Sequence, residues 1–388
     1  MLRARFVAVI AALFAFALAL LSPRAAHAEP GDELTVYVIT FGPGDEAFYK
    51  FGHDAIWIHN AGAPPGETVK RDPIQMVQED LKRQCRGSTN SMRRDPVYNW
   101  GTFTFGDPAL IPKFVTGRFQ YWLSKQPMCW TVSVYQHENR SVVAQELSLT
   151  AAQKKALYDM VEENAREENK HYKYDYYRDN CATRVRDVVD KVIGGKLQTT
   201  SQETASITWR QHTMRLTADD KVLALALDVV MGSVIDRPIN QWQEQFLPAY
   251  VQEGLKRVVV PGPDGKDVPL VSKEVVLAST EGRAPLRTAP PSWGIYMFMA
   301  GLVFGGAMFG AGLFMRNNLA LRIAMGAMLF FAGALCLLSV LFLFAWVGTD
   351  HEVGYHNENI LQLLPPCIGL MGFCIGVGRL KLLSIARA

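Results

Sequence analysis

One cysteine stands where a helix is predicted to begin. Residues 177–184 read Tyr-Arg-Asp-Asn-Cys-Ala-Thr-Arg, and apolar residues then recur at helical spacing until a Gly-Gly pair ends the run. With Asn180 as the N-cap, the sulfur of Cys181 lies against unpaired backbone N–H groups and the positive end of the helix dipole. This setting favours the thiolate, which is the nucleophilic form of cysteine. The pattern therefore indicates either covalent catalysis or a buried structural cysteine.

A nucleophilic cysteine needs a base, and His53 is the best placed of the eight histidines. It follows a glycine-containing turn and enters a predicted strand, a rigid position that projects a side chain at the end of a sheet. Asn99, on the next predicted strand, is expected to orient the imidazole. Asp54 is less suited to that role because its side chain points to the opposite face of the strand. The predicted catalytic residues are therefore Cys181, His53 and Asn99.

Four further residues are candidates for substrate binding: Asn180, Arg184, His351 and Asn359. Arg184 lies about one turn into the helix, where it can bind phosphate or form a surface ion pair. His351 and Asn359 belong to a short polar loop, residues 349–359, which is either a solvated turn or a segment that binds a head group or supports the catalytic domain. The sequence contains no CxxC or HExxH pattern, so we expect no metal and no cofactor.

The elements that must position these residues suit an α+β fold. Residues 29–286 are long enough for one domain, and strands come first and helices follow, as in a small antiparallel sheet with helices packed beside it. We expect strands at 34–41, 55–58, 97–105 and 130–135. Helices are expected from Thr150, from Cys181 and within 217–234, and residues 251–286 have the composition of a linker.

The two ends of the chain point to export and to a membrane. Residues 1–28 have the pattern of a signal peptide. Apolar runs at 293–315, 319–348 and 360–378 predict three spans within a membrane domain, 287–388, and their basic flanks are expected to be cytoplasmic. The sequence thus predicts a multi-pass protein of a bacterial inner membrane with its catalytic domain in the periplasm.

The six cysteines and the net charge bear on the disulfide bonding and on the class of partner. Three cysteines lie in the exported part, where Cys85 and Cys129 are able to form a disulfide and Cys181 is left over. The formal net charge of +3, without a basic stripe, argues against a nucleic-acid partner. Nothing in the pattern fixes an oligomeric state.

Residues 51–56, 98–103 and 179–184 resemble the Lnb-type N-terminal periplasmic domain family, and the resemblance continues through 246–248 and 349–351. The order of histidine before cysteine is also similar to the permuted papain-like fold of lecithin retinol acyltransferase relatives. The resemblance implies a permuted papain-like domain that passes a phospholipid acyl chain through a cysteine thioester. It implies a membrane phospholipid as donor and the N-terminus of a bacterial lipoprotein as acceptor.

The expected reaction is acyl transfer, in which His53 takes the proton of Cys181 and an amine receives the acyl chain. The alternatives are an NlpC-type cysteine hydrolase of peptidoglycan, a phospholipase-like hydrolase with water as acceptor, and an envelope module that only binds. The sequence does not separate water from an amine as acceptor.

Overall fold

Alternating apolar residues build a seven-stranded antiparallel sheet in the order β6-β4-β3-β2-β1-β5-β9. The computed structural model describes residues 29–62, 71–86, 95–104, 108–262, 265–314, 318–361, 363, 369 and 372. The strands of the sheet are β1 (Thr35–Phe41), β2 (His53–His59), β3 (Pro96–Thr102), β4 (Gln120–Pro127), β5 (Val142–Leu147), β6 (His171–Lys173) and β9 (Val271–Ala278). A separate hairpin pairs β7 (Val259–Pro261) with β8 (Asp267–Pro269).

Helices cover both faces of the sheet. One face, with Val38 and Ile56, packs against α6 (Ala151–Asn164), α7 (Cys181–Val192) and α12 (Pro248–Lys256). The other face, with Ile39 and Trp57, packs against α2 (Pro73–Lys82) and α5 (Met128–His137). Strand residues therefore alternate between two cores, as the period of two requires.

Smaller helices lie beside this sandwich. They are α4 (Leu110–Val115), α8 (Lys196–Thr200), α9 (Trp209–Leu216), α10 (Lys221–Val230), α11 (Gln241–Glu244) and the 3-10 turns η1 (Ala47–Tyr49), η2 (Ser233–Asp236) and η3 (Glu352–Gly354). A third apolar cluster, which includes Trp209 and Phe246, joins α9 to the segment before α12. The mixed α+β fold with an antiparallel sheet agrees with the prediction, although the sheet is large where a small one was expected. The permuted papain-like arrangement stays a prediction.

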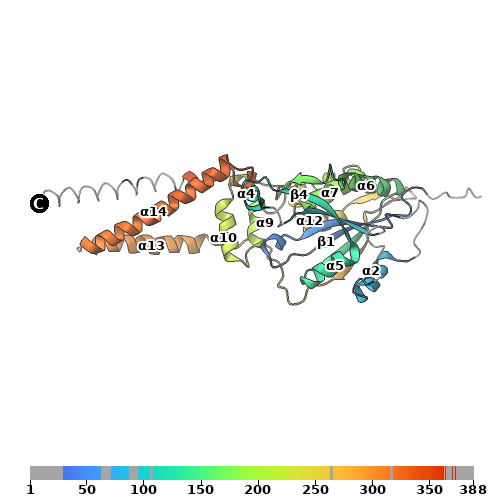
Figure 1. Cartoon of the computed structure of the whole chain (residues 1–388), viewed down its shortest axis with the longest axis horizontal. Coiled ribbons are helices and arrows are strands. Elements are labelled where there is room, and N and C mark those ends of the chain that lie inside the picture. Colours follow the sequence, from blue (N-terminus) through green and yellow to red (C-terminus); the bar gives the residue numbers. More distant parts are fainter. Residues whose placement is uncertain are drawn as a thin grey trace, which may run out of the picture.

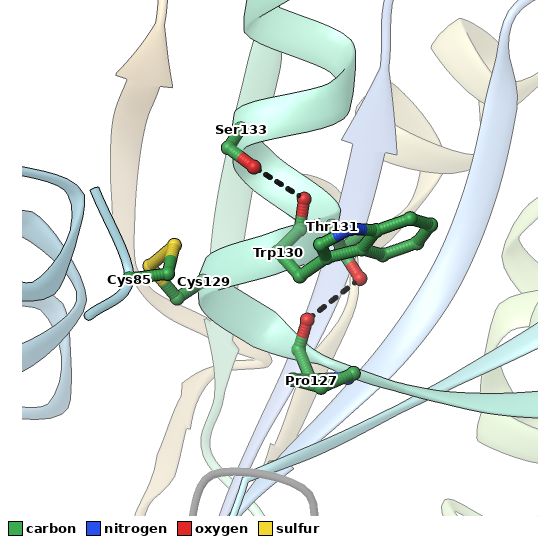
Figure 2. The surroundings of a disulfide bond; sticks show 6 residues. All are labelled: Cys85, Pro127, Cys129, Trp130, Thr131 and Ser133. Atoms are coloured by element: carbon green, nitrogen blue, oxygen red, sulfur yellow. Dashed lines mark hydrogen bonds between the residues drawn. A yellow bond between two sulfur atoms is a disulfide. The ribbon is translucent and has the colours of Figure 1, made fainter. Parts of the chain in front are cut away.

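Two elements differ from the sequence-based expectation. Residues 130–135, expected as a strand, belong to α5, because Met128, Thr131 and Val132 bury one helical face on the sheet. The hydroxyl of Thr131 also donates to the Pro127 carbonyl at 2.9 Å, as Figure 2 shows. Residues 251–286, expected as a linker, contain the end of α12 and the edge strand β9, which pairs with β5.

A disulfide joins Cys85, just after α2, to Cys129 in the first turn of α5 (Figure 2). The bond spans 44 positions of the chain and fastens two helices on the same face of the sheet. The pairing of these two cysteines, with Cys181 left as a thiol, agrees with the sequence-based expectation.

Two long apolar helices, α13 (Gly294–Phe314) and α14 (Asn318–Val347), extend from one end of the domain (Figure 1). Within the described residues, one helical segment, Met325–Val347, is long and apolar enough to cross a membrane. The predicted spans 293–315 and 319–348 coincide with these helices. The third, 360–378, and the predicted signal peptide, 1–28, lie wholly or mostly outside the described residues.

Candidate active site

Helix α7 begins at Cys181, and Asn180 caps it as predicted. The Asn180 Oδ1 accepts the Thr183 backbone N–H at 2.9 Å, and the Thr183 hydroxyl accepts the N–H of Asn180 at 2.8 Å. The Asn180 Nδ2 donates to the carbonyls of Tyr176 and Phe246, each at 2.9 Å. Since the amide of Asn180 is fully used within the protein and is buried, its observed role is to fix the backbone that presents Cys181.

Strand β2 begins at His53, directly after a glycine that the turn requires. Gly52 has φ of +81°, and a Cβ there would come within 2.9 Å of the Phe41 carbonyl oxygen. The Nε2 of His53 lies 3.0 Å from Oδ1 of Asn99. The amide nitrogen of Asn99 donates to Gln126 at 3.2 Å, so its oxygen faces the imidazole. Nε2 then carries the proton, and Nδ1 is the basic atom of the ring.

Cys181 lies near the start of β2, because the backbone N–H of Asp54, the residue after His53, is among the donors at its sulfur. The ladder between β2 and β3 pairs Ile56 with Tyr98 and Trp57 with Val97. Gly101 has φ of +91°, and a Cβ built there would lie 3.8 Å from the Cβ of Cys181. Cys181 therefore lies beside the residue two positions after Asn99, whose side-chain oxygen is 3.0 Å from Nε2 of His53.

Several donors surround the Cys181 sulfur. They are the backbone N–H groups of Asp54, Ala182 and Cys181 itself, together with the hydroxyl of Tyr174, and each of them favours the thiolate. Burial outweighs them, so the pKa of the Cys181 thiol is raised above its ordinary value. The expectation that the helix start favours a thiolate is thus wrong for this state, because the sulfur is shielded from water.

His53 is shifted in the complementary direction. Burial lowers the pKa of its imidazole to about 4, although the hydrogen bond with Asn99 opposes that shift. At neutral pH the site therefore holds a neutral imidazole and a neutral thiol. Such a pair works as a base and an acid that exchange a proton during the reaction, without a preformed ion pair.

The side chain of Asp54 lies on the face opposite to His53, as predicted. The ring of His53 stacks near Tyr135 of α5, with centroids 6.2 Å apart. Asp54 is instead fully buried, and its Oδ1 accepts the Thr40 hydroxyl at 2.9 Å. Burial raises the pKa of the Asp54 carboxyl to about 8, with the nearby Cys181 adding to the shift. At pH 7 this side chain is mainly an uncharged acid.

An aromatic cleft lies between the segment that precedes Cys181 and the loop that follows α14. Its walls include Phe114, Tyr174, Tyr176 and His351. The ring of Tyr176 stacks on His351 with centroids 6.1 Å apart, and the Nε2 of His351 donates to the Phe114 carbonyl at 2.7 Å. Tyr174, which lines this cleft, also has its hydroxyl among the donors at the Cys181 sulfur, so the cleft lies next to the thiol.

The remaining candidates have partners within the protein. Arg184 forms an ion pair with Asp179, whose Oδ2 lies 2.6 Å from Nη2, and its guanidinium stacks 4.3 Å above the Tyr172 ring. The Nδ2 of Asn359 donates to the Val229 carbonyl at 3.0 Å. The structure therefore contains the ion-pair alternative for Arg184 and the supporting alternative for the loop; binding of a head group by either stays a prediction.

Two residues at this site were not identified from the sequence. The hydroxyl of Tyr174 is a hydrogen-bond donor at the Cys181 sulfur, and the side-chain oxygen of Gln126 accepts from Asn99 and so orients it. The alternating tyrosines 172, 174 and 176 ahead of Cys181 were the available signal for the first. Within the described residues, no group of three or more His, Cys, Asp or Glu side chains is arranged to hold a metal ion.

Comparison with known proteins identifies part of this chain. Neither the search of curated proteins nor the search of solved structures returned a match. Residues 81–216 match the family model described as the Lnb N-terminal periplasmic domain. The matched segment contains Asn99, Tyr174 and Cys181, and His53 precedes it. This segment of the chain is therefore similar to the Lnb N-terminal periplasmic domain family.

Proposed function

We propose that this protein is a membrane-anchored cysteine acyltransferase that moves a phospholipid acyl chain, through a thioester on Cys181, to an amine. The acceptor we propose is the N-terminal amine of a bacterial lipoprotein. The observation that carries the proposal is the position of Cys181 at a helix start. Its sulfur is near the backbone of Asp54, the residue after His53, and near the hydroxyl of Tyr174, which lines an aromatic cleft. The family match and the apolar helix α14 support a membrane setting.

In the first half-reaction, Nδ1 of His53 takes the thiol proton as the sulfur attacks the ester carbonyl carbon of the phospholipid. The tetrahedral intermediate collapses when the carbon–oxygen bond to glycerol breaks. The leaving alkoxide takes the proton from His53 and departs as a lysophospholipid, and the acyl chain stays on sulfur. The low pKa of His53 suits this step, since the imidazole is neutral at the outset and its conjugate acid is a ready proton donor.

The second half-reaction reverses the roles. The acceptor amine attacks the thioester carbonyl and gives up a proton to His53, and the sulfur leaves and recovers that proton. The products are an amide and a free thiol, so atoms and protons balance over the cycle. Water in place of the amine would instead release a fatty acid.

We propose that the oxyanion of both intermediates is bound by the backbone N–H of Cys181 and the hydroxyl of Tyr174. Both groups lie within reach of the Cys181 sulfur. Burial raises the pKa of the Tyr174 phenol well above its ordinary range, so this hydroxyl stays protonated and remains a donor. Donors fixed in a water-poor site are the common means of stabilising such an oxyanion.

The test is intact-mass analysis of the full chain in nanodiscs made from a phospholipid with two different acyl chains. We expect a hydroxylamine-sensitive mass gain of one acyl group, with the equivalent lysophospholipid released. Cys181→Ala should abolish the gain, and Cys336→Ala, in α14, should leave it intact. A diacylated lipopeptide with a free amine should then discharge the adduct as an amide, and its N-acetylated form should not.

Three outcomes would count against the proposal. Absence of an adduct together with absence of lysophospholipid would reject covalent acyl chemistry. Release of fatty acid with no amide product would favour a hydrolase. Cleavage of a peptidoglycan peptide by the wild type but not by Cys181→Ala would favour a peptidase.

A further inference from the structure

Three short elements at the membrane end of the domain expose apolar side chains. Six residues form this apolar collar: Phe48 of η1, Ile111 and Val115 of α4, and Val222, Leu225 and Val230 of α10. Val222 is 81 % exposed and Ile111 is 72 % exposed, so neither contributes to the core of the domain. A soluble surface seldom gathers large apolar groups in this way without a partner.

Helix α10 is the clearest case. Its sequence, KVLALALDVV, is apolar at eight of ten positions, yet Ala224 is its one buried residue. The Asp220 side chain caps the helix by accepting two backbone N–H groups. Leu227 packs against the third apolar cluster, but Val222, Leu225 and Val230 stay exposed. A short, well-formed helix with such an exposed apolar face has the character of a helix that lies in a membrane interface.

The collar surrounds the domain-side end of α14. The Phe114 carbonyl of α4 accepts from His351, and the Val230 carbonyl of α10 accepts from Asn357, both in the segment just after α14. Phe48 joins α4 through its ring contact with Phe114, at 6.4 Å between centroids. Figure 1 shows α4 and α10 on the side of the domain from which α13 and α14 leave.

Tryptophans mark the level of the interface at the same place. Trp346 lies near the domain-side end of α14 and packs against His356, with ring centroids 5.0 Å apart. Trp293 directly precedes α13. Tryptophan is enriched where the hydrocarbon meets the head groups of a bilayer. The collar therefore lies at the depth at which a lipid surface would begin.

We infer that the apolar collar docks the domain on the bilayer surface, with α10 and α4 inserted at the boundary between head groups and acyl chains. The partner that we propose for the collar is phospholipid, because the collar is continuous with the apolar helices α13 and α14. Docking at this level holds the mouth of the aromatic cleft, between Phe114 and His351, at the height of the lipid head groups. The inference concerns position alone and does not depend on the acyl-transfer chemistry.

The test is photolabelling of the full chain in nanodiscs that contain a phosphatidylcholine with a diazirine on its acyl chain. The Cys181→Ala variant is used, so that no enzymatic acylation is mistaken for a photoadduct. After proteolysis, we expect lipid adducts on peptides that contain α10 and α4 as well as on α14. The control is β9, where Val276 is 57 % exposed but lies outside the collar, and it should remain unlabelled.

Two variants sharpen the result. Val222→Glu combined with Leu225→Glu should bring labelling of α10 down to the level of β9 without a change in melting temperature, because both side chains are exposed. Val276→Glu, the matched control, should leave all labelling unchanged. Labelling confined to α13 and α14 would overturn the inference. So would cross-links between α10 helices of two copies in place of lipid adducts, since the collar would then be a protein interface.

Discussion

Two histidines in this domain share a shifted acidity but differ in their hydrogen bonding. Burial lowers the pKa of both His53 and His212. His212 has a partner on each ring nitrogen, Glu244 at 2.8 Å on Nε2 and the Nε of Arg215 at 3.0 Å on Nδ1. Within the described part of the chain, His53 has a hydrogen bond on Nε2 alone.

The difference shows that burial and a shifted pKa do not by themselves mark a catalytic histidine. A ring nitrogen without a hydrogen-bond partner among the described residues is what distinguishes His53, and it makes His53 the candidate base of the proposed reaction. The carboxylate and guanidinium at His212 complete its hydrogen bonding and leave the ring no proton to exchange. The neutral amide at His53 fixes the tautomer and leaves Nδ1 available.

The most direct test of this contrast removes each ring in turn. His53→Ala should reduce acyl transfer by about a thousandfold, because the base is lost, and should leave the melting temperature near that of the wild type. The measurement is the rate of lysophospholipid formation in nanodiscs, with Cys181→Ala as the inactive reference. Equal losses in His53→Ala and His212→Ala would break the contrast.

The second ring should matter for stability. His212→Ala leaves the buried carboxylate of Glu244 and the guanidinium of Arg215 without their shared partner, at a cost of about 3 kcal/mol. Thermal unfolding of the detergent-solubilised protein measures this loss. His171→Ala is the matched control, since His171 is exposed on β6 and should change stability little. A melting temperature for His212→Ala as high as that of His171→Ala would show that this network is not structural.

The residue that orients His53 should tune its acidity. Asn99→Asp places a negative charge 3.0 Å from Nε2, which stabilises the imidazolium and raises the pKa of His53 from about 4. The acidic limb of the pH–rate profile should therefore move to higher pH, with activity lowered roughly tenfold at pH 6. Asn99→Ala should lower the rate without that upward displacement. An unmoved limb in Asn99→Asp would mean that this titration is not that of His53.

Local features of this fold were predictable, and features that depend on distant pairing were not. The start of α7 was predicted because the capping residues Asn180 and Thr183 are contiguous with it. The strand predicted at 130–135 was wrong because burial of one helical face outweighs the β-propensity of its Val, Thr and Tyr residues. Strand β9 was missed because its pairing with β5 lies more than 100 residues away.

The candidate site divides in the same way. Cys181 and His53 could be recognised from the sequence because one begins a helix and the other begins a strand. Asn99 could be recognised from its place on the next strand. Tyr174 acts through a contact made only after the sheet and helix have packed. The pKa of Cys181 was predicted wrongly because the start of the helix can be recognised from the sequence, whereas the burial of the sulfur cannot.

That misjudgement yields the mildest prediction, on the thiol itself. Since burial raises the pKa of Cys181, alkylation of the full chain by iodoacetamide should accelerate from neutral pH into the alkaline range, beyond the midpoint of an ordinary cysteine, about 8.5. Tyr174→Phe removes one donor to the thiolate and should move that midpoint further up. Tyr158→Phe is the control, because that phenol lies on α6 and is not among the donors at the sulfur. A fast alkylation that is already complete and constant below pH 7 would contradict the neutral pair, and would mean that His53 and Cys181 rest as an ion pair.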